Sequence, residues 1–241
     1  MLRDFLFDTS FNNHQNEYSL LKNILKHSLG EIILSLIVTL VAYILSYKLF
    51  NFILYSAVGT QYHKIIEISL FILLVVFGVT CYVLTHSVRD NIHIPLGIKK
   101  ELGIILLNSF TMALISVMWL PANFSIIYTS AIILFAFIFL INQIANISFS
   151  YYGFWLCYGI IGLSVAFLLY HLTNCTPFTF LTNIIMLIVY INSINKEIRN
   201  VKCTLLKIGS YNFNSNYAYN RLTFSGYNSI FITILDFFTN L

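Results

Sequence analysis

The fold is decided by the run LGIILLNSFTMALISVMWLPANFSIIYTSAIILFAFIFLINQIANISFSYYGFWLCYGIIGLSVAFLLYHLTNCTPFTFLTNIIMLIVYINSIN, from Leu102 to Asn195, which contains no Asp, Glu, Lys or Arg. A soluble domain surrounds its core with charged side chains. An uncharged run of this length, broken only by short polar turns, instead requires an apolar solvent around it. The sequence therefore predicts that this chain packs in a lipid bilayer.

The composition of the whole chain supports the same conclusion. Hydrophobic residues make up 59% of the 241 residues and charged residues only 9%, whereas ordinary soluble domains carry about 25% charged residues. At about 20 residues for each transmembrane helix, the chain has room for six to eight spans and little else. We therefore expect no second, soluble domain.

Apolar runs divide the chain into seven expected spans: Glu31–Phe50, Ile65–His86, Leu102–Leu120, Phe124–Ile144, Tyr151–His171, Pro177–Ile194 and Thr223–Phe238. Each must be a helix, because an unpaired backbone amide is very costly in hydrocarbon. The last span is short and carries Asn228 and Asp236, so we expect the other six helices to surround it. The prediction is an all-α membrane protein: an N-terminal tail over residues 1–30, then a seven-transmembrane-helix bundle over 31–241 with the last helix central.

Basic residues predict the orientation of the bundle. If the seven spans alternate, eleven of the 13 Lys and Arg residues fall on one side and only Lys48 and Lys64 on the other. Such an asymmetry marks the cytoplasmic side. The tail is therefore expected in the cytoplasm, and a bacterial inner membrane is the expected location. Because membrane topology already accounts for the basic residues, we expect no nucleic-acid partner.

The sequence contains little that points to chemistry. It lacks the HExxH, GxSxG and glycine-rich phosphate-binding motifs, so we expect no enzymatic activity and no cofactor. His63 and Glu67 are the one pair of potential metal ligands on one helical face, and we interpret them as interfacial residues rather than a metal site. Glu67 and Asp236 are the acids expected at membrane depth, where such residues are rare enough to suggest function; the alternative is that both, near a span end, reach the aqueous interface.

A family resemblance begins near the end of the fourth span. The stretch from Asn142 to Ile198, with Ser148–Phe154 followed by Gly159, Gly162, Val165 and Ala166, resembles the Bax inhibitor-1/YccA family. The segment Val189-Tyr190-Ile191-Asn192-Ser193 is similar to that family's "ILYDT" helix. The carboxyl-terminal pieces Asn216-Tyr217 and Ser225–Leu235 are similar to its final helix. The resemblance covers about the last 100 residues, and it implies a seven-helix bundle with a central seventh helix.

The departure from the family pattern concerns two aspartates. The family's calcium-leak members carry one in the "YDT" helix and one in the last helix, which share protons as a pH-sensitive latch. The first position here is Asn192, or Ile191 if Tyr190 is matched to the family tyrosine, and the second is Asn228 or Ser229. None of these side chains ionises, so any permeation is expected to be insensitive to pH between about 5 and 8 from these groups. Asp236 lies about two turns beyond Asn228, too far to substitute directly.

Two function classes follow from the resemblance. The first is a Ca²⁺ leak channel with a latch that does not titrate, for which Asn192, Asn228, Ser229 and Asp236 are the candidate latch or pore residues. The second is a regulator that binds a membrane partner, as the YccA branch does with the FtsH protease. The polar tail Met1–Gly30 is the segment expected to bind that partner. A permease-type subunit is less favoured, because the chain has only three prolines to break its helices.

Overall fold

The computed structural model describes residues 15–90, 98–118, 123–144 and 150–226. These ranges form helices α2 (Gln15–Ala57), α3 (His63–Asp90), α4 (Ile98–Met118), α5 (Phe124–Ile144), α6 (Tyr151–Thr173) and α7 (Pro177–Ile208). A further helical stretch over residues 215–226, called the 215–226 segment below, follows a short turn after α7. No strand occurs in the described ranges.

The described part of the chain contains six helices long and apolar enough to cross a membrane. They coincide with the first six expected spans, so the prediction of an α-helical, multi-pass membrane protein is confirmed. The seventh expected span, Thr223–Phe238, lies outside the described residues except for 223–226. Its crossing of the membrane and its central position therefore stay predictions.

Local sequence signals explain several helix ends. Ser150 caps α6 by accepting a hydrogen bond from the Gly153 backbone N–H at 3.0 Å. Helix α6 ends at Thr173, and its C-cap Asn174 adopts a left-handed conformation with φ 46°. Thr176 then caps α7 in the same way as Ser150 caps α6, and Pro177 occupies the first turn, where its missing N–H costs nothing. The expected turn between these two spans is confirmed.

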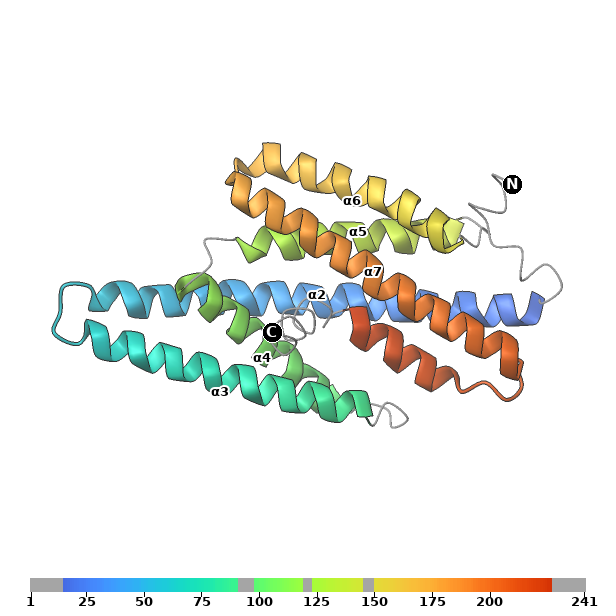
Figure 1. Ribbon diagram of the computed structural model, residues 1–241, viewed down its shortest axis with the longest axis horizontal. Helices are drawn as coiled ribbons and strands as arrows, with labels where there is room; N and C mark the ends of the chain where they lie inside the picture. The colour runs from blue at the N-terminus through green and yellow to red at the C-terminus, as the bar shows by residue number, and fades with distance from the viewer. Residues whose placement is uncertain (1–14, 91–97, 119–122, 145–149, 227–241) are drawn as a thin grey trace.

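Helix α2 is the longest of the described helices and runs along the whole bundle (Figure 1). It has 43 residues, which corresponds to about 64 Å, roughly twice the thickness of the hydrocarbon core. Along its middle it packs mainly against α4 and α5, whereas α6 and α7 pack against each other and against α5. Helix α3 returns antiparallel to α2, and the turn that joins them lies beyond the ends of α4 to α7 (Figure 1).

The main core is built from side chains of all six described helices, and it is rich in aromatic side chains. Tyr43 of α2 lies edge-on to Tyr128 of α5, with ring centroids 5.8 Å apart, and its hydroxyl donates to Ser116 Oγ of α4 at 3.1 Å. At Gly162, α6 lies against α7, and a Cβ added there would make an ordinary contact of 3.4 Å with Ile191 Cδ1. Small residues at such crossings are typical of membrane bundles.

Two helices are much longer than the spans predicted from hydrophobicity. Helix α2 begins at Gln15 rather than at the expected Glu31, and α7 continues past the expected end at Ile194 to Ile208. Both extensions are amphipathic, with Leu21 and Ile24 on α2 packing against Val201 and Leu205 on α7. Helix α2 runs unbroken through residue 30, so the predicted border between tail and membrane domain falls within one continuous helix.

Candidate functional site: the 215–226 segment and its polar contacts

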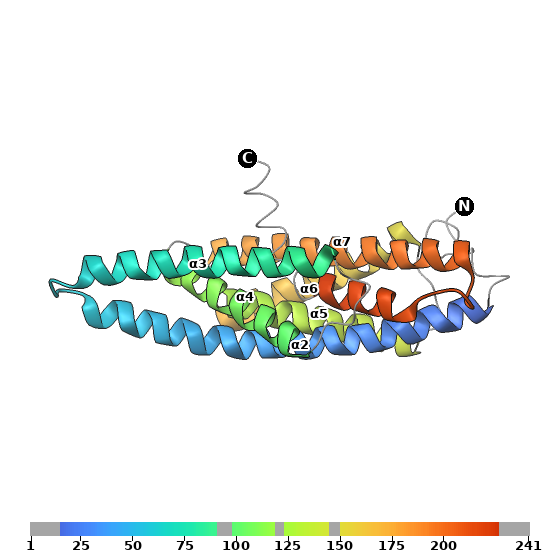
Figure 2. The same cartoon turned by 90° about the horizontal axis from the view of Figure 1, so that it is seen from below.

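The 215–226 segment lies between α2 and α7 (Figure 2). Ala218 and Leu222 are 0% and 1% exposed, and they pack into the apolar cluster formed by the N-terminal part of α2 and the C-terminal part of α7. We call this assembly of residues 15–30, 196–208 and 215–226 the basic-end unit. Its lysines and arginines include Lys22, Lys26, Lys196, Arg199, Lys202, Lys207 and Arg221.

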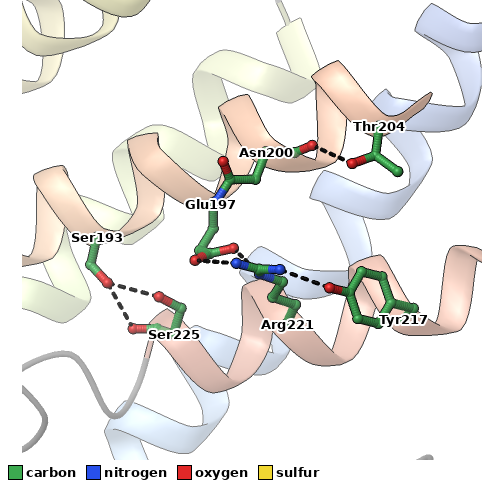
Figure 3. Close-up of polar contacts among 7 residues, drawn as sticks. All are labelled: Ser193, Glu197, Asn200, Thr204, Tyr217, Arg221 and Ser225. Carbon is green, nitrogen blue, oxygen red and sulfur yellow. Dashed lines mark hydrogen bonds and ion pairs between the residues drawn. The ribbon is translucent and has the colours of Figure 1, made fainter. Parts of the chain in front are cut away.

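An ion pair joins the 215–226 segment to α7 (Figure 3). Arg221 Nε donates to Glu197 Oε2, and Arg221 Nη2 donates to Glu197 Oε1 at 3.4 Å. On its other side Arg221 Nη1 donates to Tyr217 Oη at 2.7 Å. Burial on its own lowers the pKa of Arg221, but the hydrogen bond and charge of Glu197 outweigh it and raise that pKa. The guanidinium is thus held in its charged form.

One turn further along both helices, a pair of hydroxyls makes the next contact. Ser193 Oγ and Ser225 Oγ lie 2.7 Å apart (Figure 3). Ser193 and Glu197 are four residues apart on α7, and Arg221 and Ser225 are four apart on the other helix. Residues at this spacing share a helical face, so the ion pair and the hydroxyl pair form one antiparallel seam.

Two carboxylates approach the opposite side of the 215–226 segment. Tyr219 lies close enough to Glu31 of α2 and Glu101 of α4 to be influenced by the charge of both. Burial, followed by the charges of Glu31 and Glu101, raises the pKa of Tyr219 to about 12. Because both acids are half-buried, these groups place negative charge between three helices at the end of the bundle where most basic residues lie.

The end of the 215–226 segment lies tightly against the bundle. Phe224 is 5% exposed and packs with Ile104 and Ile105 of α4. A Cβ added at Gly226 would overlap the side chain of Ile32 on α2. Only glycine allows this approach, so the segment enters the space between α2 and α4 at its last described residue.

The structure describes only one of the latch residues that the sequence predicted. Asn192 is exposed on α7, and the neighbouring Ser193 makes the contact with the other helix instead. Asn228, Ser229 and Asp236 lie outside the described residues. Sequence reasoning missed Ser193, Glu197, Arg221 and Ser225, although their spacing of four residues along each helix was a readable signal.

The described residues contain no group of three or more His, Cys, Asp or Glu side chains that could hold a metal ion. Of the pair noted in the sequence, His63 begins α3 and Glu67 is exposed one turn later. Compared with known proteins, the chain matches no family model, no curated protein and no solved structure. Fold and site together therefore define a class, an α-helical multi-pass membrane protein with a polar seam at its basic end.

Proposed function

We propose that this protein is a passive leak pathway for cations, Ca²⁺ first among them, in which the 215–226 segment is the latch. The N-terminus is cytoplasmic and the membrane is a bacterial inner membrane in this proposal. It rests on the resemblance of the C-terminal half to the Bax inhibitor-1/YccA family and on the polar seam between the last two described helices. A latch between those two helices is the feature that the resemblance implies.

The observation that carries the proposal is the placement of Glu31 and Glu101 around Tyr219. Carboxylates at the mouth of a helical bundle raise the local concentration of cations. They are half-buried, which makes their interaction with a passing cation stronger than in bulk water. A cation entering from the basic end would meet this pair before the apolar interior.

The seam explains how such a pathway stays closed. Its hydroxyl pair, Ser193 and Ser225, does not ionise between pH 5 and 8. The latch is therefore held by neutral hydrogen bonding and by the Arg221–Glu197 ion pair, and flux should change little across that pH range. This differs from a pair of aspartates, whose shared proton makes a latch sensitive to pH.

The test is Ca²⁺ flux into liposomes that contain the purified full chain and an entrapped calcium-sensitive dye. We expect flux above that of empty liposomes, and a reduction of about tenfold in the double variant Glu31→Gln/Glu101→Gln, equivalent to about 1.4 kcal/mol. Glu67→Gln is the matched control, because this acid is exposed on α3 away from the seam. Arg221→Met should raise the flux, since it removes the ion pair of the latch.

Each outcome of this experiment has a separate meaning. No flux from the wild-type protein contradicts the leak pathway as a whole. Flux that the double variant leaves unchanged contradicts the role of the two acids. Flux that rises or falls steeply between pH 5 and 8 in the wild type, and loses that dependence in Asn192→Ala, contradicts the non-titrating latch.

A second candidate function is a regulator that binds a membrane protein partner such as a membrane protease. The observation that favours it is the basic-end unit, which exposes Lys26, Lys196 and Lys207 and extends beyond the described ends of α3 to α5 (Figure 1). A partner with an acidic surface on the cytoplasmic side would fit it. Co-purification of a membrane protease without Ca²⁺ flux would favour this function, and a triple Lys→Glu variant should then lose the partner.

A further inference from the structure

Three buried polar groups on α5 and α7 have no hydrogen-bond partner among the described residues: Tyr128 Oη, Tyr190 Oη and Asn183 Oδ1. Their parent residues are 1%, 0% and 1% exposed, respectively. Buried polar groups are nearly always paired, either with protein or with ordered water. Three unpaired groups on two neighbouring helices therefore call for an explanation.

The hydrogen bonds that are made fix the orientation of Asn183. Its Nδ2 donates to Ser130 Oγ of α5 at 2.8 Å, and Ser130 Oγ itself donates to the carbonyl of Ile126 at 2.8 Å. The Ser130 hydrogen is thus already used, and the Asn183 amide cannot turn over without losing its own bond. Asn183 Oδ1 consequently remains as an acceptor that faces the interior.

The two tyrosines are held in place by their rings. The Tyr190 ring lies edge-on to Phe135, with centroids 5.7 Å apart, and the Tyr128 ring lies 5.8 Å from that of Tyr43. Tyr128, Phe135 and Tyr190 belong to one cluster of buried side chains. Because both rings are enclosed, neither hydroxyl can rotate out to reach solvent.

Asn183 belongs to the same cluster through the geometry of α7. It precedes Tyr190 by seven residues, two turns along the same helical face. The hydrogen-bond partner of Asn183, Ser130, lies two residues after Tyr128 on α5, so Asn183 and Tyr128 lie at a similar level of the bundle. The three groups therefore line one polar region at the α5–α7 interface, within the apolar part of the bundle.

The chemistry of the three groups selects the ligand. Two of them are O–H donors and one is an acceptor only. A metal cation could coordinate the oxygens but would leave both phenolic hydrogens without an acceptor, and no carboxylate belongs to the cluster. A water molecule both accepts and donates, and it needs two to four polar partners of this kind.

We propose that Tyr128, Tyr190 and Asn183 form a buried binding site for water molecules, which link α5 to α7 by hydrogen bonds inside the membrane-spanning bundle. The site is independent of the cation pathway, since none of its residues takes part in the seam. It also limits what this interface can hold, because a site of neutral donors and acceptors favours uncharged, water-sized molecules.

The first test is thermal unfolding of the full chain in detergent, comparing Tyr128→Phe, Tyr190→Phe and the double variant with the wild type. If the hydroxyls hold water, removing them loses hydrogen bonds, and we expect the double variant to fall by about 2–4 °C in Tm. If the hydroxyls are unpaired, phenylalanine removes a buried polar group and Tm stays or rises, which overturns the proposal. Tyr55→Phe is the matched control, because this tyrosine of α2 is 78% exposed.

The second test detects the water directly. Infrared difference spectra of the wild type, recorded in ordinary water and in water labelled with ¹⁸O, should contain a bound-water stretching band that shifts with the label. The band should disappear in the double Tyr→Phe variant and persist in Tyr55→Phe. A spectrum with no such difference between the wild type and the double variant overturns the proposal, whatever happens to Tm.

Discussion

Both ends of α2 carry large apolar side chains, but these lie in different environments. At the basic end, Leu21 and Ile24 are 5% and 6% exposed, because α7 and the 215–226 segment cover them. At the other end, which we call the hairpin end (residues 45–68), Leu49, Phe52 and Tyr55 are 56%, 71% and 78% exposed. The basic end of α2 is thus enclosed by two helical partners, whereas at the hairpin end Phe50 and Ala57 are buried and these three side chains remain exposed.

This difference shows which contacts between helices stabilise the tertiary structure. In a bilayer, lipid covers an exposed leucine as well as protein does, so helices associate through close packing and polar contacts rather than through burial alone. The basic-end unit has both, with the apolar cluster around Leu205 and the Arg221–Glu197 pair. The hairpin end should therefore tolerate substitutions that disrupt the basic end.

The largest expected effect comes from truncating equivalent leucines at the two ends of α2. Leu21→Ala leaves a cavity in the apolar cluster and should cost about 2–5 kcal/mol, whereas Leu49→Ala should cost well under half of that. Thermal unfolding of both variants in detergent provides the measurement. Equal losses would mean that the hairpin end is packed as tightly as the basic end, which contradicts the comparison.

Glycine substitutions should differ in sign between the 215–226 segment and α3, the helix that follows the hairpin end. At Gly226, alanine would overlap Ile32, which is 0% exposed and has no room to move, so Gly226→Ala should cost about 1–3 kcal/mol. At Gly78 in α3, nothing lies within 4 Å of an added Cβ, so Gly78→Ala should stabilise the helix by up to about 1 kcal/mol. Limited proteolysis together with Tm would report both changes.

The ionisation of Tyr219 is expected to lower the stability of the folded protein, and only at high pH. Its pKa of about 12 in the folded protein lies above the value of about 10 for an unfolded chain. The unfolded state therefore loses this proton first, and the stability that the neutral phenol contributes is lost as pH rises from about 10 to 12. Tyr219→Phe should flatten that decline, whereas Tyr55→Phe should leave the Tm–pH profile unchanged.

The smallest expected effect distinguishes two neighbours on α7. Ser193→Ala removes the hydroxyl pair with Ser225 and should cost about 0.6 kcal/mol, the average for interhelical hydrogen bonds in membrane bundles. Asn192→Ala alters an exposed side chain and should change Tm much less. A larger loss for Asn192→Ala would return the latch to the position that the sequence predicted.

The sequence predicted the apolar spans well and the contacts poorly. The ends of α5 were predicted to the residue, because Phe124 follows a polar turn and the apolar run is sharply bounded. The extensions of α2 and α7 were missed, because hydrophobic run length does not detect an amphipathic stretch that continues the helix beyond the apolar run. Asn192 was selected by resemblance, but rotation about the helix axis presents Ser193 to the neighbouring helix.

By itself, the sequence determined the solvent and the class of this protein. An uncharged run from Leu102 to Asn195 permits no other environment than lipid, and in lipid each apolar span must satisfy its own backbone hydrogen bonds as a helix. Only the tertiary structure decided which polar side chains meet, as it did for Arg221 with Glu197 and for Ser193 with Ser225. The physical reason is that hydrophobicity specifies the depth of a helix in the membrane, whereas its rotation and its neighbours depend on packing between whole helices.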